Sequence, residues 1–150
     1  DIIMTPDPDF MPDPVILAKI HAECFVTPRP WNADEFGGFL FDPDVIFAGL
    51  HDAFALGRII LDEAELLTLA VAKDARRLGL GRLRLLEFER AARLRGATSC
   101  LLEVAADNQP ALALYESTGY RESGRRNGYY SRSGAQNVDA ILMSRALTHH

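Results

Sequence analysis

Two glycines in a basic turn are the residues of this sequence whose types and spacing are best suited to ligand binding. Gly79 and Gly81 are flanked by Arg76, Arg77 and Arg82, between an apolar run and a long stretch without glycine or proline. A strand that leads through such a turn into a helix exposes consecutive backbone N–H groups at the positive end of the helix dipole. The arginines add positive charge. We therefore expect the turn to bind a pyrophosphate, through Arg76, Arg77, Leu78, Gly79, Leu80, Gly81 and Arg82.

The glycine spacing excludes two familiar nucleotide-binding motifs. The third glycine of G-x-G-x-x-G is absent, and no acidic residue stands at the distance that a dinucleotide site requires. No Gly-Lys-Ser/Thr follows, so the turn is not a nucleotide P-loop either. On these residues alone, a turn that merely connects two elements remains the alternative.

Glu103 is the candidate for a general base. It follows Leu101 and Leu102 and precedes Val104 and Ala105 in a predicted strand. A carboxylate among apolar neighbours is costly to bury unless it serves a purpose, and a positioned carboxylate can take a proton from an attacking group. The alternative is a glutamate on an exposed edge or one paired with an arginine.

The length and composition indicate one ordinary globular domain over residues 1–150. Hydrophobic residues make up 48% and charged residues 25% of the chain, which excludes a disordered protein. No apolar run is long enough to span a bilayer. The start, Asp1 to Met4, lacks the basic-then-apolar layout of a secretory signal. Cys24 and Cys100 fit reduced thiols better than a disulfide framework, so we expect a cytoplasmic location.

The net charge of −5 hides an asymmetry between the two halves of the chain. Residues 1–65 carry thirteen acidic and three basic side chains, whereas the remainder carries eight acidic and thirteen basic ones. A basic segment in an acidic protein suggests a small anionic ligand rather than nucleic acid. His21 and His51 lack metal-ligand spacing, so we expect structural or surface roles for them and no metal site.

The predicted elements form an α/β or α+β fold, in which helices cover one layer of sheet. The basic turn connects a strand of this sheet to a helix, and Glu103 lies on another strand. The order is two helices, a hairpin and a third strand, then helix, strand, helix and two final strands. The expected helices cover residues 14–24, 33–40, 81–95 and 108–117, and the expected strands cover 45–50, 53–60, 65–72, 98–105, a segment around Tyr120 and 138–143.

Two motifs together resemble the GNAT family of N-acetyltransferases. The first, Arg-x-x-Gly-x-Gly, begins at Arg76 after a strand that ends in Ala-Val. The second, Asn-x-x-Ala-x-x-x-Tyr-x-x-x-Gly-Tyr, runs from Asn108 to Tyr120. The resemblance covers residues 65–126. It implies a GNAT-type fold, with a mixed central sheet flanked by helices, and acetyl-CoA as the cosubstrate.

The resemblance also implies roles for individual residues. Glu103 would accept the proton of the amine, and Tyr115 would protonate the CoA sulfur. Without the resemblance, Tyr115 would be interpreted as a packed aromatic residue. Backbone N–H groups between Thr68 and Val71 would bind the pantetheine arm and the thioester oxygen, which adds Leu69, Ala70 and Val71 to the expected cofactor site. Asn108 would combine helix capping with a hydrogen bond to the cofactor.

Within this family the chain is similar to the ribosomal-protein-alanine N-acetyltransferases (RimI type). The similar segments are residues 61–67, 102–104, 125–127, 129–130 and 139–143. This implies acetylation of a protein's N-terminal α-amine, in the type case the alanine that starts a small-subunit ribosomal protein. Gly128 interrupts a run that is usually continuous, and the loop 26–31 is longer than expected. A small amine or a lysine as acceptor is one alternative, and an acyl-CoA-binding sensor without catalysis is another.

Overall fold

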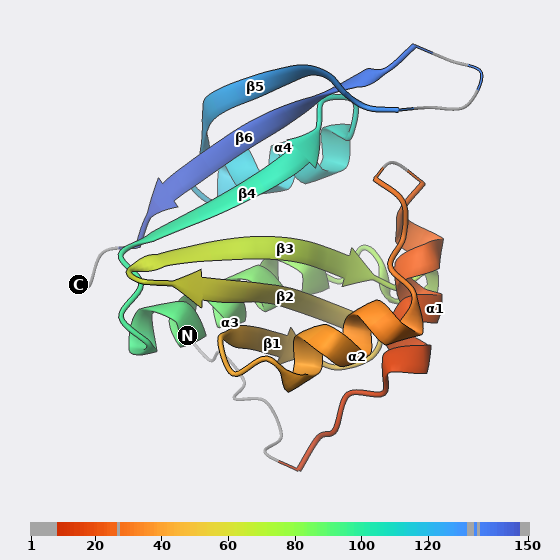
Figure 1. Cartoon of the computed structure of the whole chain (residues 1–150), viewed down its shortest axis with the longest axis vertical. Helices are drawn as coiled ribbons and strands as arrows, with labels where there is room; N and C mark the ends of the chain where they lie inside the picture. The colour runs from red at the N-terminus through yellow and green to blue at the C-terminus, as the bar shows by residue number, and fades with distance from the viewer. Residues whose placement is uncertain (1–8, 27, 132–133, 135, 148–150) are drawn as a thin grey trace.

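One mixed sheet forms the centre of the molecule in the computed structural model, which describes residues 9–26, 28–131, 134 and 136–147 (Figure 1). The strand order within these residues is β1-β2-β3-β4-β6-β5. Among the strands of these described residues, β3 and β4 are parallel neighbours and the other neighbouring pairs are antiparallel. The strands are β1 (Val45–Gly49), β2 (Ala53–Ile60), β3 (Glu63–Val71), β4 (Ser99–Ala105), β5 (Arg121–Tyr130) and β6 (Val138–Ala146).

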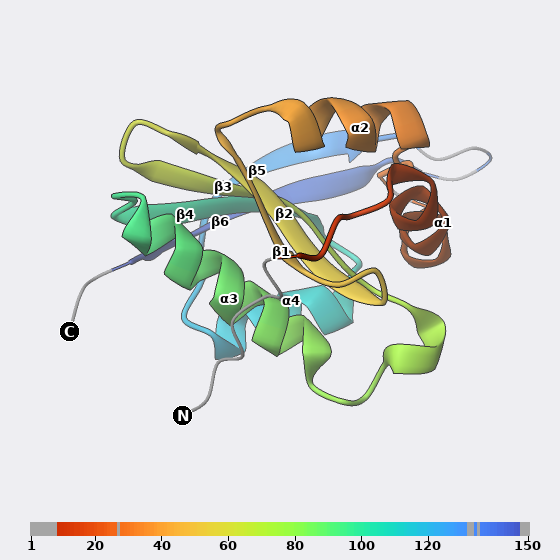
Figure 2. The ribbon, with the colours of Figure 1, turned by 90° about the horizontal axis from the view of Figure 1, so that it is seen from below.

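Helices cover both faces of this sheet (Figure 2). One core cluster joins α1 and α2 to the sheet, through Leu17 and Phe36 packed with Phe54, and a second joins α3 and α4 to the opposite face, through Leu85 and Tyr115. The helices are α1 (Pro14–Cys24), α2 (Ala33–Phe41), α3 (Leu80–Leu94) and α4 (Gln109–Ser117), with a short 3₁₀ helix, η1 (Lys73–Ala75). The predicted fold class, one mixed sheet flanked by helices, is confirmed.

Local sequence signals account for the helix starts. The Asp13 side chain accepts a hydrogen bond from the Val15 N–H, and Pro14 occupies the first turn, where its missing N–H costs nothing. Asn32 and Glu35 form a reciprocal capping box at the start of α2. Both starts agree with the sequence-based expectation.

The last part of the chain departs from that expectation. The strand signal around Tyr120 becomes β5, a ten-residue edge strand whose side chains are mostly exposed. Its polar sequence lacks the apolar alternation that marks a half-buried strand, so only pairing with β6 reveals its length. The short η1 was not predicted. The expectation about Asp1 to Met4 lies outside the described residues.

Within the described part of the chain, no helix combines the length and the apolar character needed to cross a membrane.

Candidate functional site

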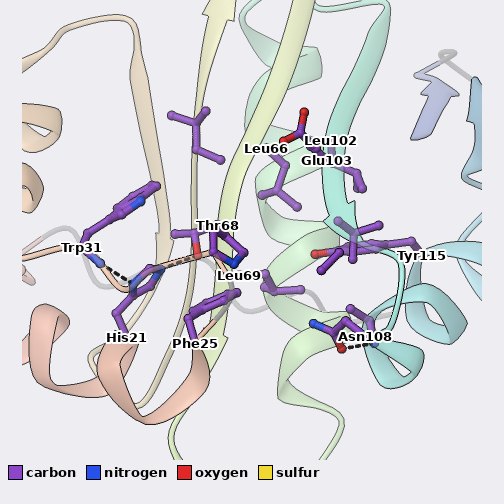
Figure 3. A pocket seen from close by; sticks show the side chains of 15 residues that line it. His21, Phe25, Trp31, Leu66, Thr68, Leu69, Leu102, Glu103, Asn108 and Tyr115 are labelled. Atoms are coloured by element: carbon purple, nitrogen blue, oxygen red, sulfur yellow. Dashed lines mark hydrogen bonds between the residues drawn. The ribbon is translucent and has the colours of Figure 1, made fainter. Parts of the chain in front are cut away.

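A cleft opens where β3 and β4 separate. The two strands pair only from Glu63 to Leu66 on β3, opposite Ser99 to Leu102 on β4, although β3 continues to Val71 and β4 to Ala105. Figure 1 shows them diverging toward α1. The hollow between them is lined by His21, Phe25, Pro28, Trp31, Leu66, Leu67, Thr68, Leu69, Leu102, Glu103, Val104, Ala105, Asn108, Ala111 and Tyr115 (Figure 3).

A second hollow adjoins the first and leads to the basic turn. It shares Phe25, Leu69, Asn108, Ala111 and Tyr115 with the first hollow, and adds Cys24, Val71, Arg76, Gly81, Pro110 and Leu114. We call the part near Val71, Arg76 and Gly81 the turn end of the cleft. The part near His21, Trp31 and Glu103 is the aromatic end. Because the hollows share residues, a long ligand bound at the turn could reach the aromatic end.

A bulge in β3 determines which side chains face the cleft. The register between β2 and β3 shifts at Leu56/Gly57, so Leu67 has no partner on β2. Leu66 packs in the cluster beneath α3 and α4, whereas Leu67 packs in the cluster beneath α1 and α2. Thr68 also faces α1, where it contacts His21. Without the bulge, strict alternation would return Thr68 to the face of Leu66.

Beyond Leu66, β3 presents backbone groups to the cleft. The Ala72 N–H donates to the Asp52 carbonyl, toward β2, whereas the Val71 carbonyl accepts from Cys24 and Arg76 on the other side. Because backbone groups alternate along a strand, the N–H groups of Leu69 and Val71 point away from β2 into the gap. Ala70 is not brought to the cleft, since by the same alternation its N–H points toward β2, and its side chain is buried among the residues that pack under α1 and α2.

The predicted anion-binding segment is an exposed turn that leads into a helix, as the sequence indicated. Arg77 and Gly79 both have positive φ, 67° and 74°. The first bond of α3 runs from the Leu83 N–H to the Gly79 carbonyl. The N–H groups of the three residues before Leu83, which are Leu80, Gly81 and Arg82, therefore lack acceptors within the helix. Such N–H groups, together with the positive end of the helix dipole, are suited to hydrogen-bond an anion.

The arginines of this turn differ in position. The Arg76 Nε donates to the Val71 carbonyl at 3.1 Å and its Nη2 contacts the Cys24 sulfur at 3.6 Å, so this guanidinium lies on the wall of the turn end. The Arg82 Nη1 donates to the Ser117 hydroxyl at 3.3 Å. Arg77 and Leu78 are exposed residues of the turn itself. Of the expected cofactor residues, Leu69, Val71, Arg76, Gly81 and Asn108 line the cleft itself.

Glu103 lies on β4 in polar company. The Tyr130 hydroxyl donates to Glu103 Oε1 at 2.8 Å, and Arg126 Nε lies 3.8 Å from Oε2. Burial, followed by this hydrogen bond, raises the pKa of Tyr130. The expectation of apolar surroundings for Glu103 was wrong. In the sheet, β5 lies on the far side of β6 from β4, and the long side chains of Tyr130 and Arg126 on β5 reach the Glu103 carboxylate. The Glu103 side chain remains 28% exposed, so it is still accessible from the cleft.

Tyr115 and Asn108 enter the cleft from the side of α4. Tyr115 is buried, its ring packs edge-on against Tyr120, and its hydroxyl points into the cleft in Figure 3. Burial raises the pKa of Tyr115, so its hydroxyl stays protonated at neutral pH. Asn108 Oδ1 accepts from the Ala111 N–H at 3.2 Å and caps α4. Its amide nitrogen faces the cleft (Figure 3), so the structure allows both expected roles.

Several residues of the aromatic end were not predicted to lie at the site. His21 is buried and structural, as expected, but it also lines the cleft with Phe25 and Thr68. Trp31 packs on Phe36 and also lines the cleft. Their spacing in the sequence carries no motif, because α1, a loop and β3 meet only in the folded chain. Tyr129 is half exposed beneath the Arg126 guanidinium, away from the cleft lining.

The thiols and potential metal ligands add no separate site. Cys100 is buried, and desolvation raises its pKa to about 11, whereas Cys24 is half-buried and donates to the Val71 carbonyl. Among the described residues, no three His, Cys, Asp or Glu side chains are grouped to hold a metal ion.

Comparison with known proteins places this geometry among acetyltransferases. The model of the Acetyltransferase (GNAT) family matches residues 15–120. The [ribosomal protein bS18]-alanine N-acetyltransferase of Escherichia coli K12 is 36% identical over 131 residues, which are 85% of this chain and 88% of that protein. The N-alpha-acetyltransferase RimI of Mycobacterium tuberculosis is 34% identical over 137 residues, 85% of this chain and 83% of that protein.

A solved structure agrees with these sequence matches. The crystal structure of the ribosomal-protein-S18-alanine N-acetyltransferase from Escherichia coli superposes with a TM-score of 0.79 at 32% identity. The match covers 92% of this chain and 90% of that one.

Proposed function

Since this chain belongs to the acetyltransferase (GNAT) family, we propose that it transfers the acetyl group of acetyl-CoA to the N-terminal α-amine of a protein. The acceptor that we propose is the N-terminal alanine of a small-subunit ribosomal protein. The observation that carries this proposal is the continuous cleft between β3 and β4. Its turn end offers backbone donors and arginines to an anion, and its aromatic end holds a carboxylate. A relative that is 36% identical to this chain over 131 aligned residues is named for this reaction.

The turn end fits the pyrophosphate of CoA. The unpaired N–H groups at the start of α3 would bind the phosphate oxygens, and Arg76 and Arg82 would compensate their charge. The N–H groups of Leu69 and Val71 would hydrogen-bond the pantetheine arm and the thioester oxygen. Donors fixed in this way would stabilise the negative charge that develops on that oxygen during attack.

Glu103 would take the proton from the attacking amine. The amine must be neutral to attack the thioester carbon, and a carboxylate at the aromatic end can receive the proton that it loses. Tyr130 and Arg126 would hold the carboxylate in one orientation through the contacts already described. A C–N bond forms and the C–S bond breaks, with no acyl-enzyme in between.

Tyr115 would donate its hydroxyl proton to the sulfur as the C–S bond breaks. The raised pKa keeps this donor protonated before the reaction. The same raised pKa makes a lasting tyrosinate unfavourable, so the phenol would regain a proton from solvent once the thiol has left. Glu103 would release the amine proton to solvent, so the net change moves one proton from the amine to the sulfur.

The direct test is mass spectrometry of ribosomal proteins incubated with this protein and acetyl-CoA. We expect one added acetyl group on the N-terminal alanine of one small-subunit protein. A parallel panel should contain a peptide with a free N-terminal alanine, the same peptide with a blocked N-terminus and an internal lysine, and small amines. Turnover confined to lysine or small amines would reassign the acceptor. Stabilisation by CoA without turnover of any amine would instead indicate a cofactor sensor.

A further inference from the structure

His21 is a buried titratable side chain at the aromatic end of the cleft for which the proposed reaction has no use. It lies on α1 at 2% exposure, and its ring packs between Phe25, Trp31 and Phe36 at centroid distances of 4.5, 5.0 and 5.3 Å. Leu17, one turn earlier on the same helix, fills the core with an apolar side chain. A leucine at position 21 would leave no polar ring atoms to satisfy, so packing alone does not explain an imidazole here.

Two hydrogen bonds determine the protonation of this ring. The Trp31 backbone N–H donates to His21 Nδ1 at 2.9 Å, so Nδ1 carries no proton. His21 Nε2 must then carry it, and it lies 2.8 Å from the Thr68 hydroxyl oxygen, to which it donates. Burial lowers the pKa of His21 to about 4, with a weaker opposing effect of Glu35 on α2, so the ring is neutral at neutral pH.

The direction of these bonds has a consequence for the cleft. The Thr68 oxygen accepts from His21, so its own O–H is available as a donor. Thr68 lines the aromatic end directly after the bulge in β3, and Trp31 lines it from the loop after α1. The imidazole therefore connects two walls of the aromatic end that belong to segments 37 residues apart in the sequence.

We propose that His21 is a positioning residue, which holds Trp31 and the Thr68 hydroxyl where the terminal residue of the acceptor binds. This inference rests on the proposed function, since it concerns the acceptor side of the same cleft. His21 acts through Trp31 and Thr68 and takes no part in proton transfer. Its loss should weaken acceptor binding and leave the acetyl-CoA end of the cleft intact.

Steady-state kinetics with an alanine-terminated peptide separate this role from a merely structural one. We expect His21→Leu to raise the KM of the peptide about tenfold, with kcat and the KM of acetyl-CoA within about twofold of the unmodified values. Thr68→Val, which removes the hydroxyl that accepts from His21 and can donate into the cleft, should act in the same direction. His21→Gln keeps an amide donor within reach of Thr68 and should restore part of the loss. Equal losses in kcat and in both KM values would overturn the proposal.

His51→Leu is the matched control. The His51 ring also accepts a backbone N–H, from Asp13 at 2.8 Å, but it does not line the cleft. The control should leave the KM of the peptide unchanged. If it raises that KM as much as His21→Leu does, the effect does not come from the aromatic end and the proposal is wrong.

Fluorescence supplies a readout that does not depend on activity. Trp31 is the only tryptophan in the sequence, so its emission reports on this wall alone. His21→Leu should shift the emission to longer wavelength and increase quenching by acrylamide, whereas His51→Leu should do neither. Unchanged emission in both His21→Leu and Thr68→Val would sink the proposal. If the unmodified protein acetylates no amine, the proposed function fails, and the emission still decides whether His21 holds Trp31.

Discussion

The two ends of the cleft are built from different parts of the chain. The turn end is centred on one continuous segment, residues 71–82, in which the N–H groups at the start of α3 lack acceptors within the helix. The aromatic end is assembled from α1, the loop after it, β3, β4 and β5, and it depends on side-chain contacts such as His21 with Thr68 and Tyr130 with Glu103. Substitutions at the turn end should therefore affect the cofactor, whereas those at the aromatic end should affect the acceptor and the chemical step.

The largest effect should follow Glu103→Gln. Loss of the proton acceptor should lower kcat by about 10²–10⁴-fold, while binding of acetyl-CoA at the other end stays unchanged in a calorimetric titration. Glu65→Gln is the matched control, because Glu65 is also a strand glutamate paired with an arginine, Arg58 at 2.9 Å. Normal turnover of the Glu103 variant would remove Glu103 from the mechanism.

Tyr115→Phe should have the next largest effect, because Tyr115 lies where the two hollows meet. We expect kcat to fall by roughly 10²-fold, measured with saturating peptide and acetyl-CoA, since the sulfur would leave without a proton donor. Tyr120→Phe provides the contrast. The Tyr120 hydroxyl donates to the fully buried Glu89 at 2.8 Å, so this variant should lower the free energy of unfolding by about 1–3 kcal/mol with little change in kcat. The reverse pattern would contradict the assignment of Tyr115.

Gly81→Ala should affect the turn end alone. An added Cβ would contact Leu114 and Val71 at ordinary distances of 3.6 and 3.7 Å, so the free protein should remain stable. The methyl group would project into the hollow beside the helix start, and we expect the KM of acetyl-CoA to rise about tenfold with an unchanged KM of the peptide. Gly37→Ala, in a helix position with open space, is the control. An unaltered KM of acetyl-CoA would show that the cofactor does not approach Gly81.

The smallest effect is a decrease in folding stability at acidic pH, which comes from His21 at the aromatic end. His21 has a pKa of about 4 in the folded protein, below its ordinary 6.5, so the unfolded chain binds more protons between these values. Its contribution to stability is complete above pH 6.5 and declines as the pH falls toward 4. Urea midpoints of the unmodified protein should therefore decrease over this window more steeply than those of His21→Gln. Parallel curves would show that His21 is not held neutral by the fold.

The sequence by itself determined the elements whose signals are contiguous. The caps at Asp13 and Asn32, the glycine turn and the helix after it depend on contacts within a few residues, so their residue types specify them. The basic turn and the Asn108 to Tyr120 motif identified the family for the same reason.

Which residues come together at the aromatic end was determined only by the tertiary structure. The separation of β3 from β4, the bulge at Leu67 and the polar surroundings of Glu103 arise from pairing between strands that are distant in the sequence. The His21–Thr68 contact joins residues 47 positions apart. No local residue pattern encodes such contacts, because burial and strand register act on the whole chain at once.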